Sequence, residues 1–377
     1  MPDLISLLSQ LVAIDSINPD LVEGAVGENT IAEFVANWGR EHGFEVHHQE
    51  VAPNRPNVIL IVRGTGGGKS LMLNAHTDTV GIAGMPYAHQ PRVEAGKLYG
   101  RGAYDMKGSL AACLLALLEI KQANLAGDVM VTAVCDEEYA SIGTQALVKK
   151  FKADYCVITE PTEQELCIAH KGFAWFDITT YGMAAHGSRP DLGIDAIAKM
   201  GYVLTGLEAL QHSLEAREKH PLLGAPSIHA SLIRGGQELS SYPDKCTLQI
   251  ERRTLPNESV DSAEMQLMTL IQQAAQHTEN FTAEISRGVV RDAFEIAPEH
   301  PLVVAMQNAA QQVTGTSPKL VGLTFWMDSA LTSAAGIPTV IYGPKGAGAH
   351  AVVEWVDLQS VSECAQVYVT LARALCG

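Results

Sequence analysis

Hydrophobic residues recur at helix spacing and at strand spacing in alternation through roughly the first 160 positions of the chain. An amphipathic helix is predicted near the N-terminus from Leu4, Leu7, Leu8 and Leu11, and a second helix over Ile31–His42. The other predicted elements are strands over Phe44–Val51, Asn57–Val62, Leu71–Leu73, Asp128–Cys135 and Tyr155–Thr159, and helices over Ser109–Gln122 and Ile142–Phe151. This alternation predicts an α/β fold, with a mostly parallel sheet flanked by helices.

The pattern changes between residues 173 and 286. Strands predicted over 174–181, 227–233, 246–252 and 281–286 are joined by helices over Gly193–Glu218 and Ser262–His277. The order β-α-β-β-α-β is that of a ferredoxin-like unit. We therefore predict a small domain inserted into a larger one, whose parts are residues 1–172 and 287–377. The antiparallel sheet of this insertion would have two edge strands, so we expect it to pair with a second copy in a homodimer.

The larger domain resumes after the insertion. Helices are predicted over Pro301–Val313 and Leu358–Leu375, and a strand over Thr339–Tyr342. That strand leads into the glycine-rich loop G-P-K-G-A-G-A-H, which ends at His350.

Composition excludes several classes of function. The formal net charge of −16 argues against nucleic acid or an anionic membrane as a partner. Seven cysteines are scattered without a C-x-x-C pair, which is typical of reduced thiols in a cytoplasmic protein. No apolar run is long enough to span a bilayer. A cytoplasmic protein of 377 residues with two domains is the expectation.

Charged and imidazole side chains follow the predicted strands where each strand ends. His76 and Asp78 come after the Leu71 strand, Glu137 and Glu138 after the next strand, and Glu160 after a third. The carboxyl ends of parallel strands meet at one edge of a sheet, where active sites gather. We therefore expect these side chains to lie close together.

Two glycine-rich loops add Asp105 and His350 to this set. Two imidazoles with several carboxylates suit a borderline metal such as zinc better than magnesium or calcium. Five ligands that share one carboxylate would hold two ions, as in two-metal hydrolases. Glu137, next to Glu138 but expected to point the other way, would then be free to act as a general base.

Each of these residues also has a simpler explanation when it is taken alone. His76 could be a hydrogen-bonded core residue, Asp105 could cap a helix, and the Asp136-Glu137-Glu138 run could be a solvated charge cluster. A phosphate-binding loop at G-T-G-G-G-K-S is excluded, because Arg63 stands where that motif requires glycine. The metal site is favoured because the candidates occur together.

Five motifs in this order, N-A-H-T-D-T, G-R-G-A-Y-D-M-K-G, D-E-E, T-E-P-T and G-A-G-A-H, resemble those of the dizinc deacylase and exopeptidase family. That family includes acetylornithine deacetylase, succinyl-diaminopimelate desuccinylase, aminoacylase and bacterial glutamate carboxypeptidase. The resemblance covers essentially the whole chain and implies two Zn²⁺ per subunit, for which Co²⁺ could substitute. It implies these ligands: a bridging Asp105, His76 and Glu160 at one ion, and Glu138 and His350 at the other.

The resemblance assigns further roles around the metals. Asp78 would orient His76, and Glu137 would activate the water that bridges the two ions. The peptide bond Asp105–Met106 would be cis.

In the insertion, His186 resembles the residue that reaches the partner's active site and stabilises an oxyanion. Arg253 resembles the arginine that binds a substrate carboxylate, with Arg252 as the alternative. Ser240 stands where relatives often have a substrate-contacting asparagine, and this departure weakens the assignment of Ser240 as a substrate contact.

The function implied is hydrolysis of the amide bond of a small Nα-acyl amino acid. Glu160 in place of aspartate resembles the deacetylase and desuccinylase branch of the family more than the aminoacylase branch, and an acetylornithine deacetylase-like enzyme is the expectation. A dipeptidase or carboxypeptidase acting on a short peptide would use the same residues and is the alternative. A non-catalytic metal-dependent binding protein is a remote one, since every ligand and the base are present.

Overall fold

The computed structural model describes residues 3–82 and 84–377, and the chain divides into two compact units. The larger unit comprises Met1–Ile168, Ile296–Val321 and Met327–Gly377, and the smaller comprises Ala169–Glu295 and Gly322–Trp326. The expected domain limits were after residues 172 and 286, whereas the main segment of the smaller unit spans Ala169–Glu295. The sequence did not predict that Gly322–Trp326 joins the smaller unit, where Trp326 Nε1 donates to the Asp292 carbonyl at 3.1 Å.

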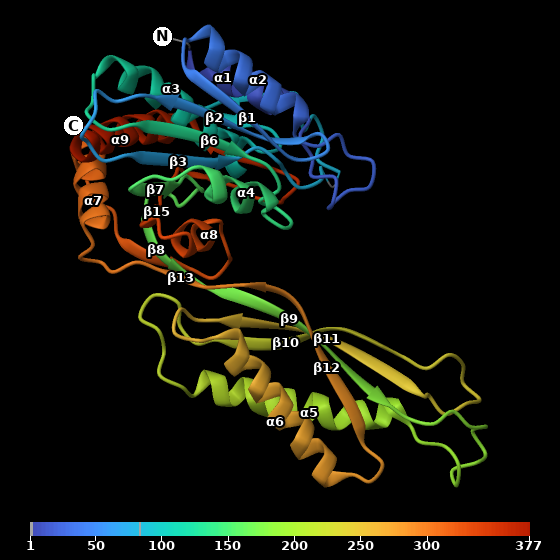
Figure 1. Ribbon diagram of the computed structural model, residues 1–377. Coiled ribbons are helices and arrows are strands. Elements are labelled where there is room, and N and C mark those ends of the chain that lie inside the picture. The colour runs from blue at the N-terminus through green and yellow to red at the C-terminus, as the bar shows by residue number, and fades with distance from the viewer. Residues whose placement is uncertain (1–2, 83) are drawn as a thin grey trace. The chain divides into compact units, whose positions relative to one another are not determined.

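A nine-stranded sheet forms the centre of the larger unit (Figure 1). In order across the sheet the strands are β1 (Glu45–Ala52), β2 (Arg55–Val62), β6 (Val129–Val134), β3 (Leu71–His76), β7 (Tyr155–Ile158), β15 (Thr339–Ile341), β8 (Leu166–His170) and β13 (Phe294–Glu295), with β14 (Leu320–Leu323) beside β8. The central strands β6, β3, β7 and β15 are parallel. Pairs nearer the edges, such as β1 with β2 and β8 with β13, are antiparallel. The predicted α/β fold is confirmed, with parallel pairing at its centre.

Helices flank this sheet and bury its central strands. They are α1 (Leu4–Ala13), α2 (Asn29–Glu41), α3 (Gly108–Gln122), α4 (Ile142–Lys150), α7 (Pro301–Thr314), α8 (Ser329–Ala334) and α9 (Leu358–Cys376). Helix α3 packs against α1, α9 and strands β3 and β6, and most of its side chains are buried. Every residue of β3 and β6 is buried as well, as expected for parallel strands covered on both faces. These buried strands give the polar residues that follow them a rigid base.

A small second sheet of the larger unit was not predicted. Its order is β16 (Gly346–Ala347), β17 (Trp355–Asp357), β5 (Lys97–Tyr99) and β4 (Arg92–Glu94). Strands of two or three residues are too short to produce a periodic pattern, which is why the sequence did not reveal them. Pairing of β17 with β5 brings the segment that carries His350 next to the segment that carries Asp105.

The smaller unit has the predicted β-α-β-β-α-β order (Figure 1). It consists of β9 (Gly172–Tyr181), α5 (Ala196–Glu215), β10 (Ser227–Gly235), β11 (Lys245–Thr254), α6 (Val260–His277) and β12 (Thr282–Arg291). The sheet order β10-β11-β9-β12 is antiparallel throughout, so β10 and β12 are its edge strands. Helix α5 is shorter than predicted because Asp195 caps it, accepting a hydrogen bond from the Ala198 amide at 2.9 Å.

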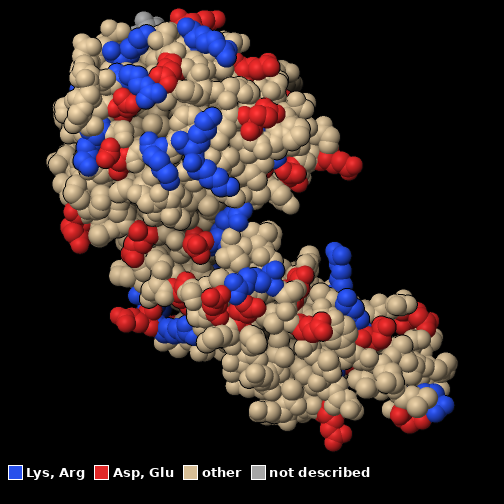
Figure 2. Space-filling view, viewed as in Figure 1, with Lys and Arg blue, Asp and Glu red and all other residues tan. Residues whose placement is uncertain are grey.

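Two surface properties complete the fold. Among the described residues, no helix is both long and apolar enough to cross a membrane. On the face shown in Figure 2, basic side chains are interspersed with acidic ones over both units.

Candidate active site

His76, the last residue of β3, lies at the centre of the candidate site and is almost fully buried. Its Nδ1 is 3.0 Å from the carbonyl oxygen of Asp78. A carbonyl oxygen can only accept, so Nδ1 carries a proton and donates it. The other ring nitrogen, Nε2, faces Asp105 Oδ1 at 3.2 Å and Glu160 Oε1 at 3.4 Å. The Asp78 carbonyl thus fixes the tautomer that presents Nε2 to the site.

Asp105 lies between the two predicted imidazoles. Its Oδ1 faces His76, and its Oδ2 is 3.5 Å from His350 Nε2. The Asp105–Met106 peptide bond is cis, as the resemblance implied. Asp105 does not cap the following helix, because the N-cap residue of α3 is Lys107 and no side chain accepts a capping hydrogen bond there. One carboxylate therefore faces both imidazoles, which is the arrangement a bridging ligand needs.

Glu354 holds the loop of Asp105 in place. Its Oε1 accepts from the amides of Tyr104 and Asp105 at 2.9 and 3.0 Å. Its Oε2 accepts from the Gly102 amide at 3.0 Å and from Arg101 Nη1 at 2.6 Å. Glu354 is almost fully buried and follows His350 by four residues. One side chain thus ties the His350 segment to the Asp105 loop.

Glu137 and Glu138 follow β6, as predicted, and lie on a turn and not in the extended strand end that would make them point opposite ways. Strand β6 ends at Val134, and Asp136 adopts a positive φ of 67°. The alternation of side chains along a strand therefore does not explain why the two glutamates differ. Glu138 Oε2 is 3.0 Å from His350 Nε2, while its buried Oε1 has no hydrogen-bond partner within the described structure.

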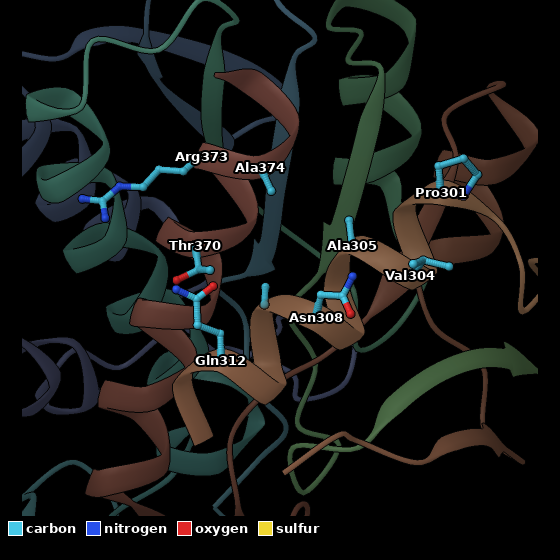
Figure 3. Close-up of a pocket in the computed structure, with 9 residues that line it drawn as sticks. Pro301, Val304, Ala305, Asn308, Gln312, Thr370, Arg373 and Ala374 are labelled. Carbon is cyan, nitrogen blue, oxygen red and sulfur yellow. The ribbon is translucent and has the colours of Figure 1, made fainter. Parts of the chain in front are cut away.

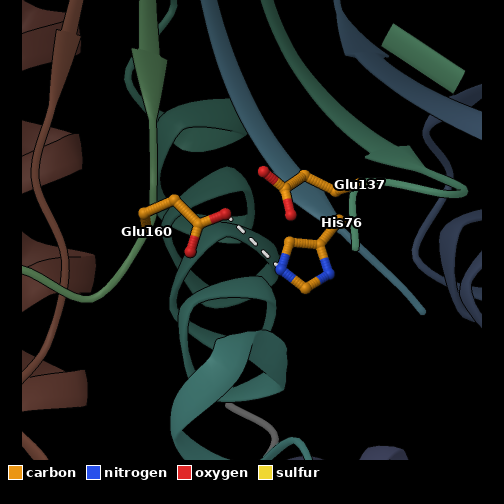
Figure 4. Close-up of side chains that lie close together, drawn as sticks. All are labelled: His76, Glu137 and Glu160. Atoms are coloured by element: carbon orange, nitrogen blue, oxygen red, sulfur yellow. Dashed lines mark ion pairs between the residues drawn. The ribbon is translucent and has the colours of Figure 1, made fainter. Parts of the chain in front are cut away.

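Glu137 faces a different part of the site from Glu138. One carboxylate oxygen of Glu137, one of Glu160 and a ring nitrogen of His76 lie within 4.8 Å of one another (Figure 4). A second group with the same spacing is formed by His76, Asp105 and Glu138. The structure thus brings together all six side chains that the sequence predicted for the metal site.

The carboxylate of Asp78 is 3.6 Å from His76 Nδ1, longer than a hydrogen bond. Its oxygens instead accept from the amides of Glu137 and Glu138, both at 3.1 Å. The Asp78 carboxylate therefore holds the 136–138 turn more directly than it holds the imidazole.

Burial and mutual repulsion dominate the electrostatics of the carboxylates. Burial raises the pKa of Glu137 and of Glu160 well above the usual range, and the charge of His76 opposes both shifts only in part. Burial together with Asp105 raises the pKa of Glu138 to about 7. Burial would also raise the pKa of Asp105, but hydrogen bonds from His350 and His76 hold it below its usual range.

The pKa values of the two imidazoles are also raised, but by the neighbouring carboxylates and not by burial. Hydrogen bonds to Asp105 and Glu138 raise the pKa of His350 to about 10. Burial would lower the pKa of His76, but Glu160 and Asp105 raise it well above its usual value. The two imidazoles and the carboxylates of Asp105, Glu138 and Glu160 form a donor set that fits divalent cations of the zinc and cobalt type, and one Glu138 oxygen has no hydrogen-bond partner among the described residues.

The three residues predicted in the insertion lie at two ends of the smaller unit. His186 and Ser240 lie together before β11, where the Ser240 carbonyl accepts from the Gly187 amide at 2.6 Å. Arg253 lies near the other end of β11, opposite Phe173 at the start of β9. Eight residues separate Lys245 from Arg253, which is about 26 Å of strand. Within this unit, His186 and Arg253 therefore cannot contact the same small molecule.

The side chains themselves are suited to binding. His186 Nδ1 accepts from the Ser188 amide at 3.2 Å, which leaves the proton of a neutral ring on the exposed Nε2. Arg253 is partly exposed and its guanidinium lies 5.2 Å from the Phe173 ring centroid. Arg252 is buried and paired with Glu258 at 2.8 Å, so of the two arginines Arg253 is the accessible one.

Sequence reasoning missed several residues that support the cluster. They include Asn18, Glu354 and Asp328, all buried. Burial raises the pKa of Asp328 to about 6, and its Oδ2 accepts from Thr144 Oγ1 at 2.5 Å. Asn18 stands in the polar segment D-S-I-N-P-D, which carries no signal of what its side chain contacts.

Two surface clefts of the larger unit lie outside the cluster. One, of about 650 Å³, lies between α7 and α9 and is lined by residues such as Asn308, Gln312 and Arg373 (Figure 3). It offers no imidazole or carboxylate. The other cleft, of about 510 Å³, is lined by residues that include Tyr87, Val353 and Glu354. Because Glu354 holds the Asp105 loop, this cleft adjoins that loop.

Comparisons with known proteins agree with this geometry. Residues 72–374 match the family model described as peptidase family M20/M25/M40. Acetylornithine deacetylase of Vibrio cholerae serotype O1 is 26% identical over 386 residues, covering 100% of this chain and 98% of that protein.

Two solved structures share the fold. Aminopeptidase PepT from Bacillus cereus has a TM-score of 0.81 at 19% identity and covers 99% of this chain and 98% of its own. A Bacillus subtilis protein described as a dinuclear metal binding peptidase from family M20 has a TM-score of 0.76 at 16% identity, covering 99% and 97% of the two chains.

Proposed function

Because the chain belongs to peptidase family M20/M25/M40, and is therefore a hydrolase, we propose that it hydrolyses the amide bond of a small Nα-acyl amino acid. The family predicted from the motifs is confirmed by this membership. The observation that carries the proposal is the clustering of His76, Asp105, Glu138, Glu160 and His350 around a half-buried Glu137.

These five ligands suit two Zn²⁺ ions, for which Co²⁺ could substitute. Asp105 would bridge the ions, with His76 and Glu160 on one side and Glu138 and His350 on the other. Bound there, the ions would lower the pKa of a coordinated water to about 7 and polarise the acyl carbonyl. Support comes from the donor set and from the dinuclear metal binding that the Bacillus subtilis relative's description records.

Glu137 is proposed to move the proton. Among the described residues, no hydrogen-bond donor is recorded for its carboxylate, although its amide is held by Asp78. Burial raises its pKa, which brings a carboxylate closer to the working pH of a general base. Glu137 would take a proton from the attacking water and deliver it to the leaving amine.

The smaller unit is proposed to form a homodimer and to complete the site. His186 follows the end of β9 at Tyr181, whereas the main segment of the smaller unit begins at Ala169 and ends at Glu295, both near the other end of β9. In that position it is better placed to reach a second copy, where its Nε2–H would stabilise the oxyanion. Ser240 would approach the substrate from the same side.

Arg253 is proposed to bind the α-carboxylate of the substrate. Its planar guanidinium can pair with a carboxylate in a bidentate manner, and stacking on Phe173 orients it. A deacylase substrate carries this carboxylate on the leaving amino acid.

A dipeptidase or other exopeptidase is the second candidate. The fold shared with an aminopeptidase favours it, and the same residues would perform the same chemistry. The six clustered side chains favour either enzyme over a binding protein without activity.

The test is amine release by the protein loaded with Zn²⁺ or Co²⁺, using acetyl- and succinyl-amino acids and dipeptides, with a chelated control. We expect chelator-sensitive release from an acylated amino acid. Release from dipeptides alone would favour the peptidase. Release from neither, with the metals bound, would contradict the proposed substrate class.

A further inference from the structure

The side chain of Asn18 lies between two buried carboxylates from distant parts of the chain. Its Nδ2 donates to Asp78 Oδ2 at 2.8 Å and to Asp136 Oδ1 at 3.0 Å. Its Oδ1 accepts from the Asp20 amide at 3.0 Å. Asn18 is fully buried. Both N–H groups of the side-chain amide therefore donate to carboxylates that flank the candidate site.

The backbone of Asn18 is fixed in this position. Ile17 forms a parallel bridge with Thr79, and the Asn18 amide donates to the Thr79 carbonyl at 2.9 Å. Ser16 Oγ donates to the Thr77 carbonyl at 2.7 Å. Residues 16–18 thus run alongside the segment that follows His76, so the side-chain amide of Asn18 is held next to Asp78.

The two carboxylates that Asn18 contacts are the ones that shape the Glu137–Glu138 turn. Asp78 accepts from the amides of both glutamates. Asp136, with its positive φ, begins the turn, and its Oδ2 accepts from the Ile142 amide at 3.2 Å. Asn18 therefore donates a hydrogen bond directly to each of the two carboxylates that support the turn.

The chemistry of the position explains why an amide is suited to it. Arg55 already pairs with Asp136 at 2.8 Å and with Glu28, so a second cation is not required there. A neutral amide gives one donor to each carboxylate without adding charge. A hydroxyl would supply one donor, and a carboxylate would add a third negative group.

We infer that Asn18 is a positioning residue for Glu137 and Glu138, acting through its bridge between Asp78 and Asp136. The inference rests on the proposed function for the roles of the two glutamates. It extends the site to a side chain that contacts neither substrate nor metal.

The test compares Asn18→Leu, which keeps the approximate shape and removes the hydrogen bonds, with Asn57→Leu. Asn57 is also fully buried and also donates two side-chain hydrogen bonds and accepts one, but it contacts neither Asp78 nor Asp136. Co²⁺ binding is measured by calorimetric titration. The kcat and KM values are measured on the compound from which the wild type releases amine in the test of the proposed function.

We expect Asn18→Leu to weaken Co²⁺ binding about 10- to 100-fold and to lower kcat by a similar factor with KM nearly unchanged, since loss of groups that orient metal ligands has that effect. Asn57→Leu should lose thermal stability but bind Co²⁺ as the wild type does. If Asn18→Leu does not fold, Asn18→Ser keeps one donor and should give a smaller loss of the same kind.

Wild-type Co²⁺ affinity and kcat in a folded Asn18→Leu protein would overturn the inference. Equal weakening by Asn57→Leu would also overturn it, because the effect would then be general destabilisation. If the wild type binds Co²⁺ but releases no amine, the proposed function fails, and the Co²⁺ affinities alone still decide the role of Asn18.

Discussion

At the scale of single residues, the site depends on carboxylates that serve more than one partner. Asp105 faces both His76 and His350, and Glu354 accepts four hydrogen bonds. Removing one such group leaves several partners unsatisfied. Substitutions should therefore have larger effects here than at singly bonded positions.

His350→Ala should reduce the number of bound metal ions per chain from two to one. His350 Nε2 faces Asp105 and Glu138, and its loss leaves the second ion with carboxylates alone. Metal content after dialysis, measured by emission spectroscopy, is the readout. His47→Ala is the control, since His47 is half exposed and contacts Glu45 and the Phe151 ring, neither of which belongs to the cluster. Retention of two ions by His350→Ala would argue against this ligand.

Glu354→Gln should destabilise the Asp105 loop without removing a proposed ligand side chain. The new amide group would oppose backbone N–H donors or Arg101, at a cost of about 1–3 kcal/mol in the free energy of unfolding. Urea denaturation of the metal-free protein measures this. An unchanged unfolding midpoint would show that the loop does not depend on Glu354.

At the scale of elements, tight turns place the ligands. Gly102 has a φ of 78°, and a Cβ there would lie 2.8 Å from Thr79 Cγ2. Gly96, between β4 and β5, has a φ of 77° and open space around it. An alanine at position 96 would introduce backbone strain alone, whereas an alanine at position 102 would introduce both strain and crowding.

Gly96→Ala should cost about 1–2 kcal/mol from the left-handed backbone alone. Gly102→Ala should cost more and should also weaken metal binding, because the displaced Thr79 and Lys107 side chains lie beside the Asp105 loop. Unfolding and Co²⁺ titration of both variants would check this. Equal effects of the two substitutions would mean that the close approach at Gly102 is unimportant.

The elements also explain how far the sequence could be interpreted. Strands β3, β6 and β7 and the ligands after them were predictable, since apolar runs ending in His76 or Glu160 are local signals. The short strands β16 and β17 were not, because they are defined by pairing, β16 with β17 and β17 with the distant β5. The roles of Asn18 and Glu354 were hidden for the same reason: their partners lie 60 and 252 residues away in the chain.

At the scale of the whole molecule, the separation of His186 from Arg253 along β11 makes a specific prediction about two chains. An inactive His186→Ala protein mixed with an inactive Glu137→Gln protein should regain activity. Each mixed dimer would hold one site with Glu137 from one chain and His186 from the other, so random exchange should restore about a quarter of wild-type activity.

Activity measured after subunit exchange decides this point. No recovery, with mixed dimers verified by mass, would place His186 in its own chain's site or outside any site. A wild-type protein that sediments as a 40.4 kDa monomer would contradict the proposed dimer directly.

The central claim is that Glu137 moves the proton in a site whose metals are held by other side chains. The most direct measurement is metal content and amine release of Glu137→Gln beside the wild type. The account predicts two bound ions per chain and a turnover reduced about a thousandfold, within the range for loss of a general base. Two bound ions with wild-type turnover, or loss of the metals themselves, would contradict it.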